Sequence, residues 1–283
     1  SPSDGSGRKV SEFHDWRSIL ASLRRRAWAI AACCLFTPGL AFAIDPFELQ
    51  VYDANITPKG QFGLELHSNY TFSGRKTPSY SGELVPDGAF RVQFEPTYGA
   101  AEWLELGLHA YTWVSSEGNP DFGGVMIRGL FVVPPESTAP FFFGIKAELG
   151  WVTKAISEEA WDQEFRFVLG YSDRVFLAVI NPIVGWPLQG STMFRPEFEP
   201  SAKLAIDTQA GFSLGFEHFS SLGAFSDGFD SASEQQHLFF SVLDLTDKQG
   251  VPPPFALNIG VGRGLTDATH AKWIAKAVVG FNL

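Results

Sequence analysis

Hydrophobic and polar residues alternate along most of the chain from residue 60 onward. In residues 60–73 the apolar set Phe62, Leu64, Leu66, Tyr70 and Phe72 shares one face of a period of two, which is the spacing of a β-strand. Twelve segments follow this pattern: 60–73, 89–98, 102–114, 125–133, 141–152, 161–171, 175–184, 194–206, 211–220, 236–245, 255–263 and 271–283. Segments of about 10 residues suit strands that cross a membrane at a tilt, because soluble strands average about 5–6. The pattern predicts an all-β fold, a transmembrane antiparallel β-barrel of about 12 strands.

The aromatic residues favour a membrane barrel over a soluble sandwich, which would bury its apolar face instead. If both ends of the barrel chain lie in the periplasm, one set of tryptophans falls at strand ends on the outer side, namely Trp113, Trp151, Trp161, Trp186 and Trp273. Trp103, Tyr98 and Tyr171 fall at the other rim. Two such aromatic girdles are typical of the two membrane interfaces. We therefore expect the apolar face of each strand to contact lipid.

The charged residues predict two details of strand pairing. The last segment, 271–283, should close the barrel by pairing with 60–73, which would direct Lys276 inward near Glu65 or His67. Between 141–152 and 161–171, we expect Glu148 to face Arg166. The register that places Lys146 opposite Arg166 also opposes two glutamates, and like charges that face each other destabilise a sheet.

Four prolines lie in or near predicted strands: Pro96, Pro182, Pro196 and Pro200. Proline has no N–H for the hydrogen-bonding ladder, and a closed barrel has no free edge to accommodate it. We therefore expect bulges or shifted boundaries in the second, seventh and eighth segments.

The segment "RRRAWAIAACCLFTPGLAFA", residues 24–43, has the layout of a secretory signal peptide cut after Ala43. Its apolar run is interrupted by Pro38 and is shorter than the roughly 20 residues of a membrane-spanning helix. Both cysteines lie within it, so a disulfide framework is excluded from the exported chain. The organisation predicted is an upstream segment plus signal peptide at 1–43, an N-terminal segment at 44–59, and a barrel at 60–283. Three interpretations of 44–59 remain open: an extra strand, a periplasmic tail or a partial plug.

The balance of charge excludes nucleic acid as a partner. Residues 1–43 hold six of the 21 Lys and Arg and three of the 31 Asp and Glu, so the rest of the chain has a net charge of −13. Nucleic-acid binding needs a basic patch, which is absent. With the signal and the barrel pattern, this composition indicates the outer membrane of a Gram-negative bacterium. The expected partners are outer-membrane lipid and lipopolysaccharide, and the barrel assembly machinery during biogenesis.

The inward face is predicted to carry charges of both signs. The residues expected to line the lumen are Glu65, His67, Arg91, Glu95, Glu105, His109, Arg128, Lys146, Glu148, Glu164, Arg166, Lys203, Glu217, Lys272 and Lys276. They suit a polar pore of weak charge selectivity, and equally a ladder of ion pairs that fills the interior. About twelve strands lies between filled barrels of about 8 and open porins of about 16. A passive channel for small solutes is the leading interpretation, and a non-conducting structural barrel is one alternative.

A second alternative is an acyl hydrolase. His218 and Ser220 lie two apart on one predicted strand, in phase with its lipid-facing residues, so the histidine could take the serine proton. Outer-membrane phospholipases and lipid A deacylases use such a pair, but they continue with Asn where this chain has Ser221. Glu234 or Gln236 would have to orient the histidine. We expect no enzyme and no cofactor. We also expect no metal, because His67 and His109 stand alone in the sequence.

Two stretches carry a family resemblance, "IDPFELQVYDANITPKGQFGLELHSNYTFSG" and "EQQHLFFSVLDL". They resemble proteobacterial outer-membrane proteins labelled as channels of the phenol meta-degradation pathway. The resemblance spans most of residues 44–283 and implies a channel whose solutes include hydrophobic or aromatic ones, but it assigns no site residues. Phe281 near the end also resembles the C-terminal aromatic signature that the barrel assembly machinery recognises.

Overall fold

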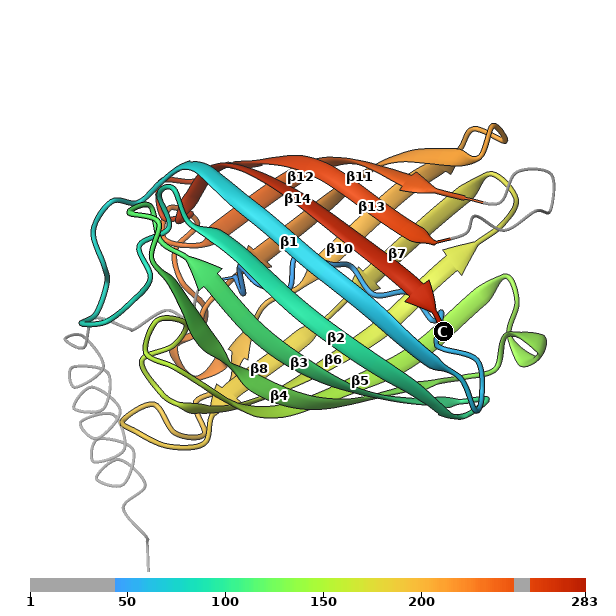
Figure 1. Cartoon of the computed structure of the whole chain (residues 1–283), viewed down its shortest axis with the longest axis horizontal. Coiled ribbons are helices and arrows are strands. Elements are labelled where there is room, and N and C mark those ends of the chain that lie inside the picture. Colours follow the sequence, from blue (N-terminus) through green and yellow to red (C-terminus); the bar gives the residue numbers. More distant parts are fainter. Residues whose placement is uncertain (1–43, 247–254) are drawn as a thin grey trace, which may run out of the picture. The chain divides into compact units, whose positions relative to one another are not determined.

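The computed structural model describes residues 44–246 and 255–283, so the predictions for residues 1–43 lie outside the described part of the chain. Antiparallel strands form a barrel (Figure 1). The strands are β1 (Phe62–Gly74), β2 (Phe90–Ala101), β3 (Leu104–Val114), β4 (Pro120–Val132), β5 (Phe141–Val152), β6 (Trp161–Ser172), β7 (Phe176–Asn181), β8 (Ile183–Pro187), β9 (Glu197–Phe198), β10 (Ser201–Asp207), β11 (Phe212–Ser221), β12 (Gln236–Leu245), β13 (Ala256–Gly264) and β14 (Ala271–Asn282), with short 3-10 turns η1 (Pro135–Ser137) and η2 (Phe225–Asp227).

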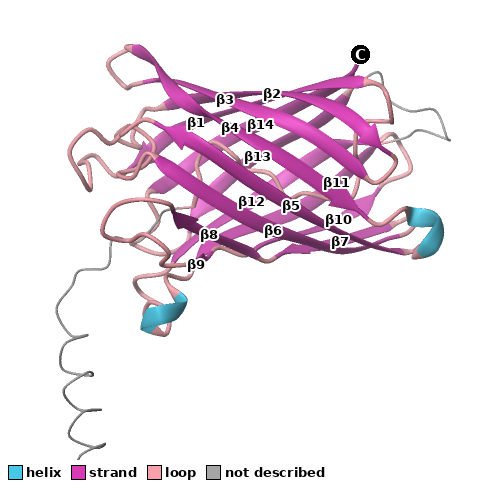
Figure 2. Ribbon diagram, turned by 90° about the horizontal axis from the view of Figure 1, so that it is seen from below, coloured by secondary structure: helices cyan, strands magenta, loops and turns pink. Residues whose placement is uncertain are grey.

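The barrel closes between its first and last strands. From β1 to β7 and from β10 to β14 each strand pairs with its neighbour in sequence, β7 and β8 both pair with β6, β9 pairs with β8, and β10 pairs with β7. The first strand, β1, pairs with β14 in a register that sets Asn69 opposite Lys276. The described strands make twelve crossings (Figure 2), because β7 with β8, and β9 with β10, each form one interrupted crossing. The predicted barrel of about twelve strands is confirmed.

Prolines cause both interruptions. Pro182 separates β7 from β8, and Pro200 precedes β10, so the seventh and eighth crossings are interrupted, as predicted. The second crossing is not, because Pro96 lies within the continuous strand β2 and pairs with Leu64. The proline carbonyls still accept hydrogen bonds, from Phe167 N to Pro182 O at 2.9 Å and from Ser220 N to Pro200 O at 3.1 Å. Each proline therefore removes only the one ladder hydrogen bond that its missing N–H would donate.

Side chains alternate between an apolar exterior and a polar interior. Phe62 and Ile127 are 60% and 61% exposed on the outer face, and many other large apolar residues share this surface. Trp161 and Trp273 are exposed near one rim, and Trp103 near the other. Trp113 is an exception to the predicted girdle, because it packs against the buried cluster that contains Phe47. The apolar exterior is that of a transmembrane barrel.

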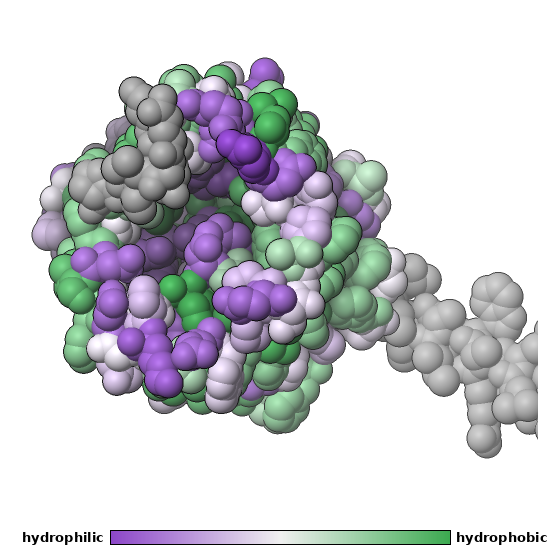
Figure 3. All heavy atoms as spheres, turned by 90° about the vertical axis from the view of Figure 1, so that its right-hand side faces the viewer, coloured by the Kyte–Doolittle hydropathy of each residue, from purple (hydrophilic) through white to green (hydrophobic). Residues whose placement is uncertain are grey.

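The two ends of the barrel differ in their connections. One end, here called the loop end, carries residues 75–89, 115–119, 153–160, 188–196, 222–235 and 265–270. The other, the C-terminal end, includes the short links 102–103, 173–175 and 208–211, and Leu283 N donates there to Phe62 O at 2.7 Å. Figure 3 looks onto the C-terminal end and shows polar residues gathered round a hollow. No helix among the described residues is long and apolar enough to cross a membrane.

Candidate functional site

Residues 44–57, here called the plug, run inside the barrel and contact several strands of its wall. Tyr52 N donates to Asn181 Oδ1 at 2.8 Å and Tyr52 O accepts from Asn181 Nδ2 at 3.0 Å, which fixes the plug to β7. On the β3 side, Thr57 N donates to Glu105 Oε2 at 2.6 Å. These contacts place the segment within the lumen.

Glu48 of the plug meets two cations of the barrel wall. Its carboxylate accepts a hydrogen bond from Lys146 and lies 3.4 Å from Arg166 Nη2. Lys146 faces Arg166 and Glu148 faces Glu164, so the register predicted for β5 and β6 is wrong. Each cation also contacts a carboxylate of its own strand, Lys146 with Glu148 at 2.8 Å and Arg166 with Glu164 at 3.1 Å. The pairwise argument failed because it considered two strands only, and the plug supplies the additional negative charge.

Tyr52 occupies the middle of this cationic region. Lys146 Nζ lies 4.0 Å from the centroid of its ring, and the guanidinium carbon of Arg166 lies 4.9 Å from it. A cation over an aromatic face is attracted more strongly where water is excluded. Backbone hydrogen bonds, ion pairs and ring contacts thus hold the plug at mid-depth in the lumen.

Lys276 points into the barrel as predicted, but its neighbours differ from those expected. It donates to Glu217 of β11 and to the carbonyl of Leu49 in the plug, the latter at 2.6 Å. Lys203 lies 3.2 Å from the same glutamate. The lysine does not reach Glu65 or His67, because the closing register sets Asn69 opposite Lys276.

The structure places most of the expected lumen residues inside the barrel. The buried ones are His67, Arg91, Glu95, Glu105, His109, Arg128, Lys146, Glu148, Arg166, Lys203, Glu217 and Lys276. Glu65 and Glu164 are partly exposed. Lys272 does not line the lumen, because it donates to the carbonyls of Thr266 and Asp267 in a connection of the loop end.

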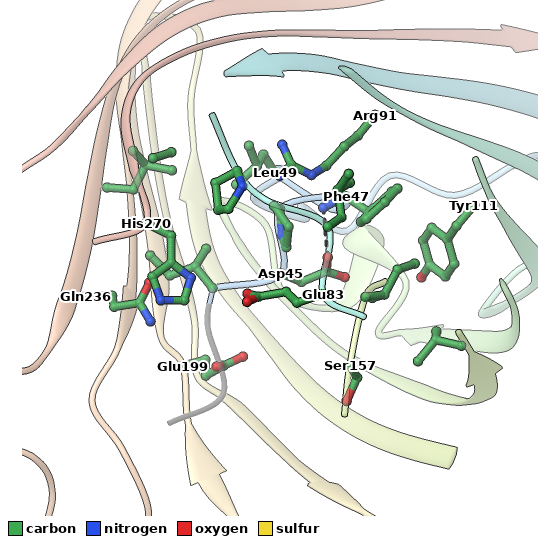
Figure 4. A pocket seen from close by; sticks show the side chains of 18 of the residues that line it. Asp45, Phe47, Leu49, Glu83, Arg91, Tyr111, Ser157, Glu199, Gln236 and His270 are labelled. Carbon is green, nitrogen blue, oxygen red and sulfur yellow. Dashed lines mark hydrogen bonds between the residues drawn. The ribbon is translucent and has the colours of Figure 1, made fainter. Parts of the chain in front are cut away.

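A cavity of about 160 Å³, here called the vestibule, lies between the plug and the loop end (Figure 4). Part of its lining is apolar and comes from Phe47, Leu49, Leu84, Tyr111, Met126, Val152 and Ile156. The ring of Phe47 packs edge-on against Tyr111, with centroids 5.3 Å apart. The plug therefore forms the floor of a small, partly apolar chamber.

Charged groups also line the vestibule, and most are acidic. The carboxylates are Asp45, Glu83, Glu148, Asp162, Glu164, Glu197 and Glu199, and the basic groups are Arg91 and His270. Burial and the nearby charges of Arg75, Arg91 and Lys272 lower the pKa of His270 to about 4. Its imidazole is consequently neutral at pH 7, which leaves the vestibule negative overall.

The side chains of His218 and Ser220 do not form a catalytic pair. His218 Nε2 lies 3.2 Å from His237 Nδ1 and the two rings stack, whereas Ser220 Oγ donates to Pro200 O at 2.9 Å. Among the hydrogen bonds of the described residues, none joins the histidine to the serine or to Glu234. A serine nucleophile needs such a bond to its base, so the geometry does not support acyl hydrolysis.

Sequence reasoning missed the contribution of the plug. Glu48, Tyr52 and the Leu49 carbonyl all bind buried lumen cations. The one available signal was that residues 44–59 mix apolar and acidic residues, which suits a segment that lies inside a lumen carrying lysines and arginines. That signal indicates the kind of contact but does not identify the partners.

Comparison with solved structures shows similar barrels. An outer-membrane channel from Pseudomonas putida F1 matches with a TM-score of 0.55 at 12% identity, over 83% of this chain and 100% of that one. The NanC porin matches at 0.51 and 10% identity, over 77% and 97%, and the KdgM porin at 0.50 and 7%, over 78% and 99%. No protein-family model matches the sequence, and no curated protein does. At these identities the likeness shows the fold, a twelve-stranded transmembrane barrel.

Proposed function

We propose that this protein is an outer-membrane channel for the passive uptake of small solutes, held closed by its own N-terminal segment. The observation that carries the proposal is a polar lumen with a vestibule at the loop end and a floor made by the plug, which is not part of the barrel wall. Barrels of similar fold are a channel and two porins, which supports transport as the function. A structural barrel would have no need of a chamber that ends on a separate segment.

Conductance measurements test this proposal. Purified protein in planar bilayers should pass ions in brief openings, and deletion of residues 44–58 should make the current larger and continuous. His218→Ala and Ser220→Ala should leave the current unchanged, because the hydrogen bonds of these side chains go to His237 and to Pro200 and not to the plug. An acyl hydrolase would instead release fatty acid from phospholipid and lose that activity in both variants. A protein that shows no conductance and no hydrolysis would favour the structural barrel.

The solute proposed is a small hydrophobic or aromatic molecule. The resemblance to phenol-pathway channels suggests this class, and the vestibule suits it in size and lining. A cavity of about 150 Å³ can hold a benzene ring, and the chamber here is about 160 Å³ with Phe47, Leu84 and Tyr111 on its wall. Phenol added on the loop side should produce short blocks of the single-channel current. Leu84→Glu should abolish those blocks without abolishing conductance.

Export and location form a further part of the proposal. We infer that the signal is removed after Ala43 and that the barrel inserts into the outer membrane, through the assembly machinery, among lipid and lipopolysaccharide. A cut there creates an α-ammonium group at Ile44, which shares its part of the lumen with Asp45, Glu164 and Glu199. Opposite charges attract strongly where water is scarce. The intact mass of protein extracted from outer membranes should equal that of residues 44–283.

A further inference from the structure

Three side chains that bind metals well meet on the lumen wall beside the plug. Glu65 and His67 lie on β1, and Glu95 lies opposite Glu65 on β2. His67 Nε2 is 3.3 Å from Glu65 Oε2 and 3.2 Å from Glu95 Oε2. One ligand atom from each of the three residues lies within 4.8 Å of the others.

His67 Nε2 lies within ion-pair distance of both glutamates without a well-directed hydrogen bond to either. Its side chain is buried, and neither ring nitrogen has a hydrogen-bond partner despite two carboxylate oxygens close to Nε2. Unpartnered buried nitrogens are costly, so this arrangement needs a physical reason. Ligand atoms bound tetrahedrally to Zn²⁺ at about 2.0–2.1 Å lie about 3.4 Å apart. The spacing of nitrogen and oxygens therefore matches the edges of a metal coordination shell.

We propose that Glu65, His67 and Glu95 bind one divalent transition-metal ion, for which Zn²⁺ is the best match, with water in the remaining position. The Glu65 side chain is 31% exposed, which provides a route for the ion from the lumen. Carboxylate oxygens and an imidazole nitrogen form a ligand set that suits Zn²⁺.

Neighbouring groups hold the two carboxylates in place. Arg128 binds Glu95 Oε1, and Gln93 Nε2 donates to Glu95 Oε2 at 3.0 Å. From the plug, Gln50 Nε2 donates to Glu65 Oε2 at 3.4 Å. Such outer partners orient metal ligands and are a regular part of metal sites. The ion would therefore lie at the contact between the plug and the wall.

A second group of similar composition shows what distinguishes the proposed site. Glu48, His109 and Glu148 also bring their ligand atoms within 4.8 Å of one another. Lys146 already lies there, as a donor to Glu48 with its Nζ 2.8 Å from Glu148. In that group the lysine lies between the two glutamates. At the proposed site Arg128 pairs with Glu95 Oε1, His109 Nε2 lies 3.3 Å from Glu95 Oε2, and no lysine or arginine of the described residues pairs with Glu65. His67 looks solitary in the sequence because its neighbour Glu95 comes from another strand.

Metal titration of the tag-free, full-length barrel tests the proposal. After treatment with EDTA and dialysis, calorimetric titration with Zn²⁺ should show one ion per barrel, and Co²⁺ should give the visible absorption of a low-coordinate site. His67→Gln and Glu65→Gln should each weaken Zn²⁺ binding by more than about tenfold. His218→Gln is the matched control and should bind as the wild type does. An excess of Mg²⁺ should not displace the ion.

Two results would overturn the proposal. The first is the absence of stoichiometric Zn²⁺ binding by the wild type, which would mean that the three side chains form ion pairs only. The second is undiminished binding by both lumen variants, which would place the ion elsewhere on the protein. Faster migration of unheated samples on SDS gels confirms that each variant is folded. If His67→Gln fails to fold, Zn²⁺ binding by Glu65→Gln still tests the proposal, because Glu65 is partly exposed and its substitution disturbs the fold less.

Discussion

A single carboxylate, that of Glu48, balances two cations that the barrel register places face to face. Lys146 and Arg166 are buried, and each relies on Glu48 in addition to a glutamate of its own strand. Removing one partner from a buried charged group typically costs about 3–5 kcal/mol. We expect Glu48→Gln to lower the free energy of unfolding by about 3 kcal/mol, measured by urea denaturation in lipid vesicles. Glu117→Gln, in an exposed loop, should have no measurable effect, and equal stability of both variants would contradict the assigned role.

His270 in the vestibule provides a prediction about pH. Its pKa is lowered to about 4 by burial and by the charges of Arg75, Arg91 and Lys272. An unfolded histidine titrates near 6.5. The lower pKa of His270 in the folded state therefore contributes to stability in full above pH 6.5, and this contribution is lost as the pH falls from 6.5 toward 4. NMR of the imidazole should give a midpoint near pH 4, and Arg75→Gln should raise it. A midpoint near 6.5 in the wild type would show that the imidazole is solvated.

At the scale of elements, the plug depends on one asparagine of β7. Asn181 bonds both the N–H and the carbonyl of Tyr52, and a buried group left without a partner costs about 1–3 kcal/mol. In Asn181→Ala the plug amides should exchange hydrogen about tenfold faster or more, as measured by mass spectrometry. Asn55→Ala is the control, because Asn55 is exposed and bonds only to Asp53. Unchanged exchange in Asn181→Ala would show that the ion pairs alone hold the plug.

For the whole molecule, the position of the charges predicts selectivity. Counting all inward charges suggested weak selectivity, but most deep charges are paired, and the excess of carboxylates lies in the vestibule. Among the described residues Asp45 and Asp162 have no salt bridge to lysine or arginine, so we expect a preference for cations. Reversal potentials in a KCl gradient at pH 8 should show it, and Asp45→Asn with Asp162→Asn should reduce it. A preference for anions in the wild type would contradict this account.

The sequence by itself determined where the strands lie and which face of each meets lipid. A period of two is a local property, because successive side chains of a strand point to opposite sides whatever the strand pairs with. Segments 141–152 and 236–245 match β5 and β12 at both ends, and the prolines marked the two interrupted crossings. The inward direction of Lys276 follows from the same alternation.

Only the tertiary structure decided which charges meet. The β5–β6 register, the partner of Lys276 and the neighbours of His67 depend on contacts between segments far apart in the sequence. Glu48 stands 98 residues from Lys146, and Leu49 stands 227 residues from Lys276. Pairing rules for two strands cannot account for a third chain segment that enters between them. Electrostatic energy is a sum over all neighbours, so the charge of the plug changed which strand register is favourable.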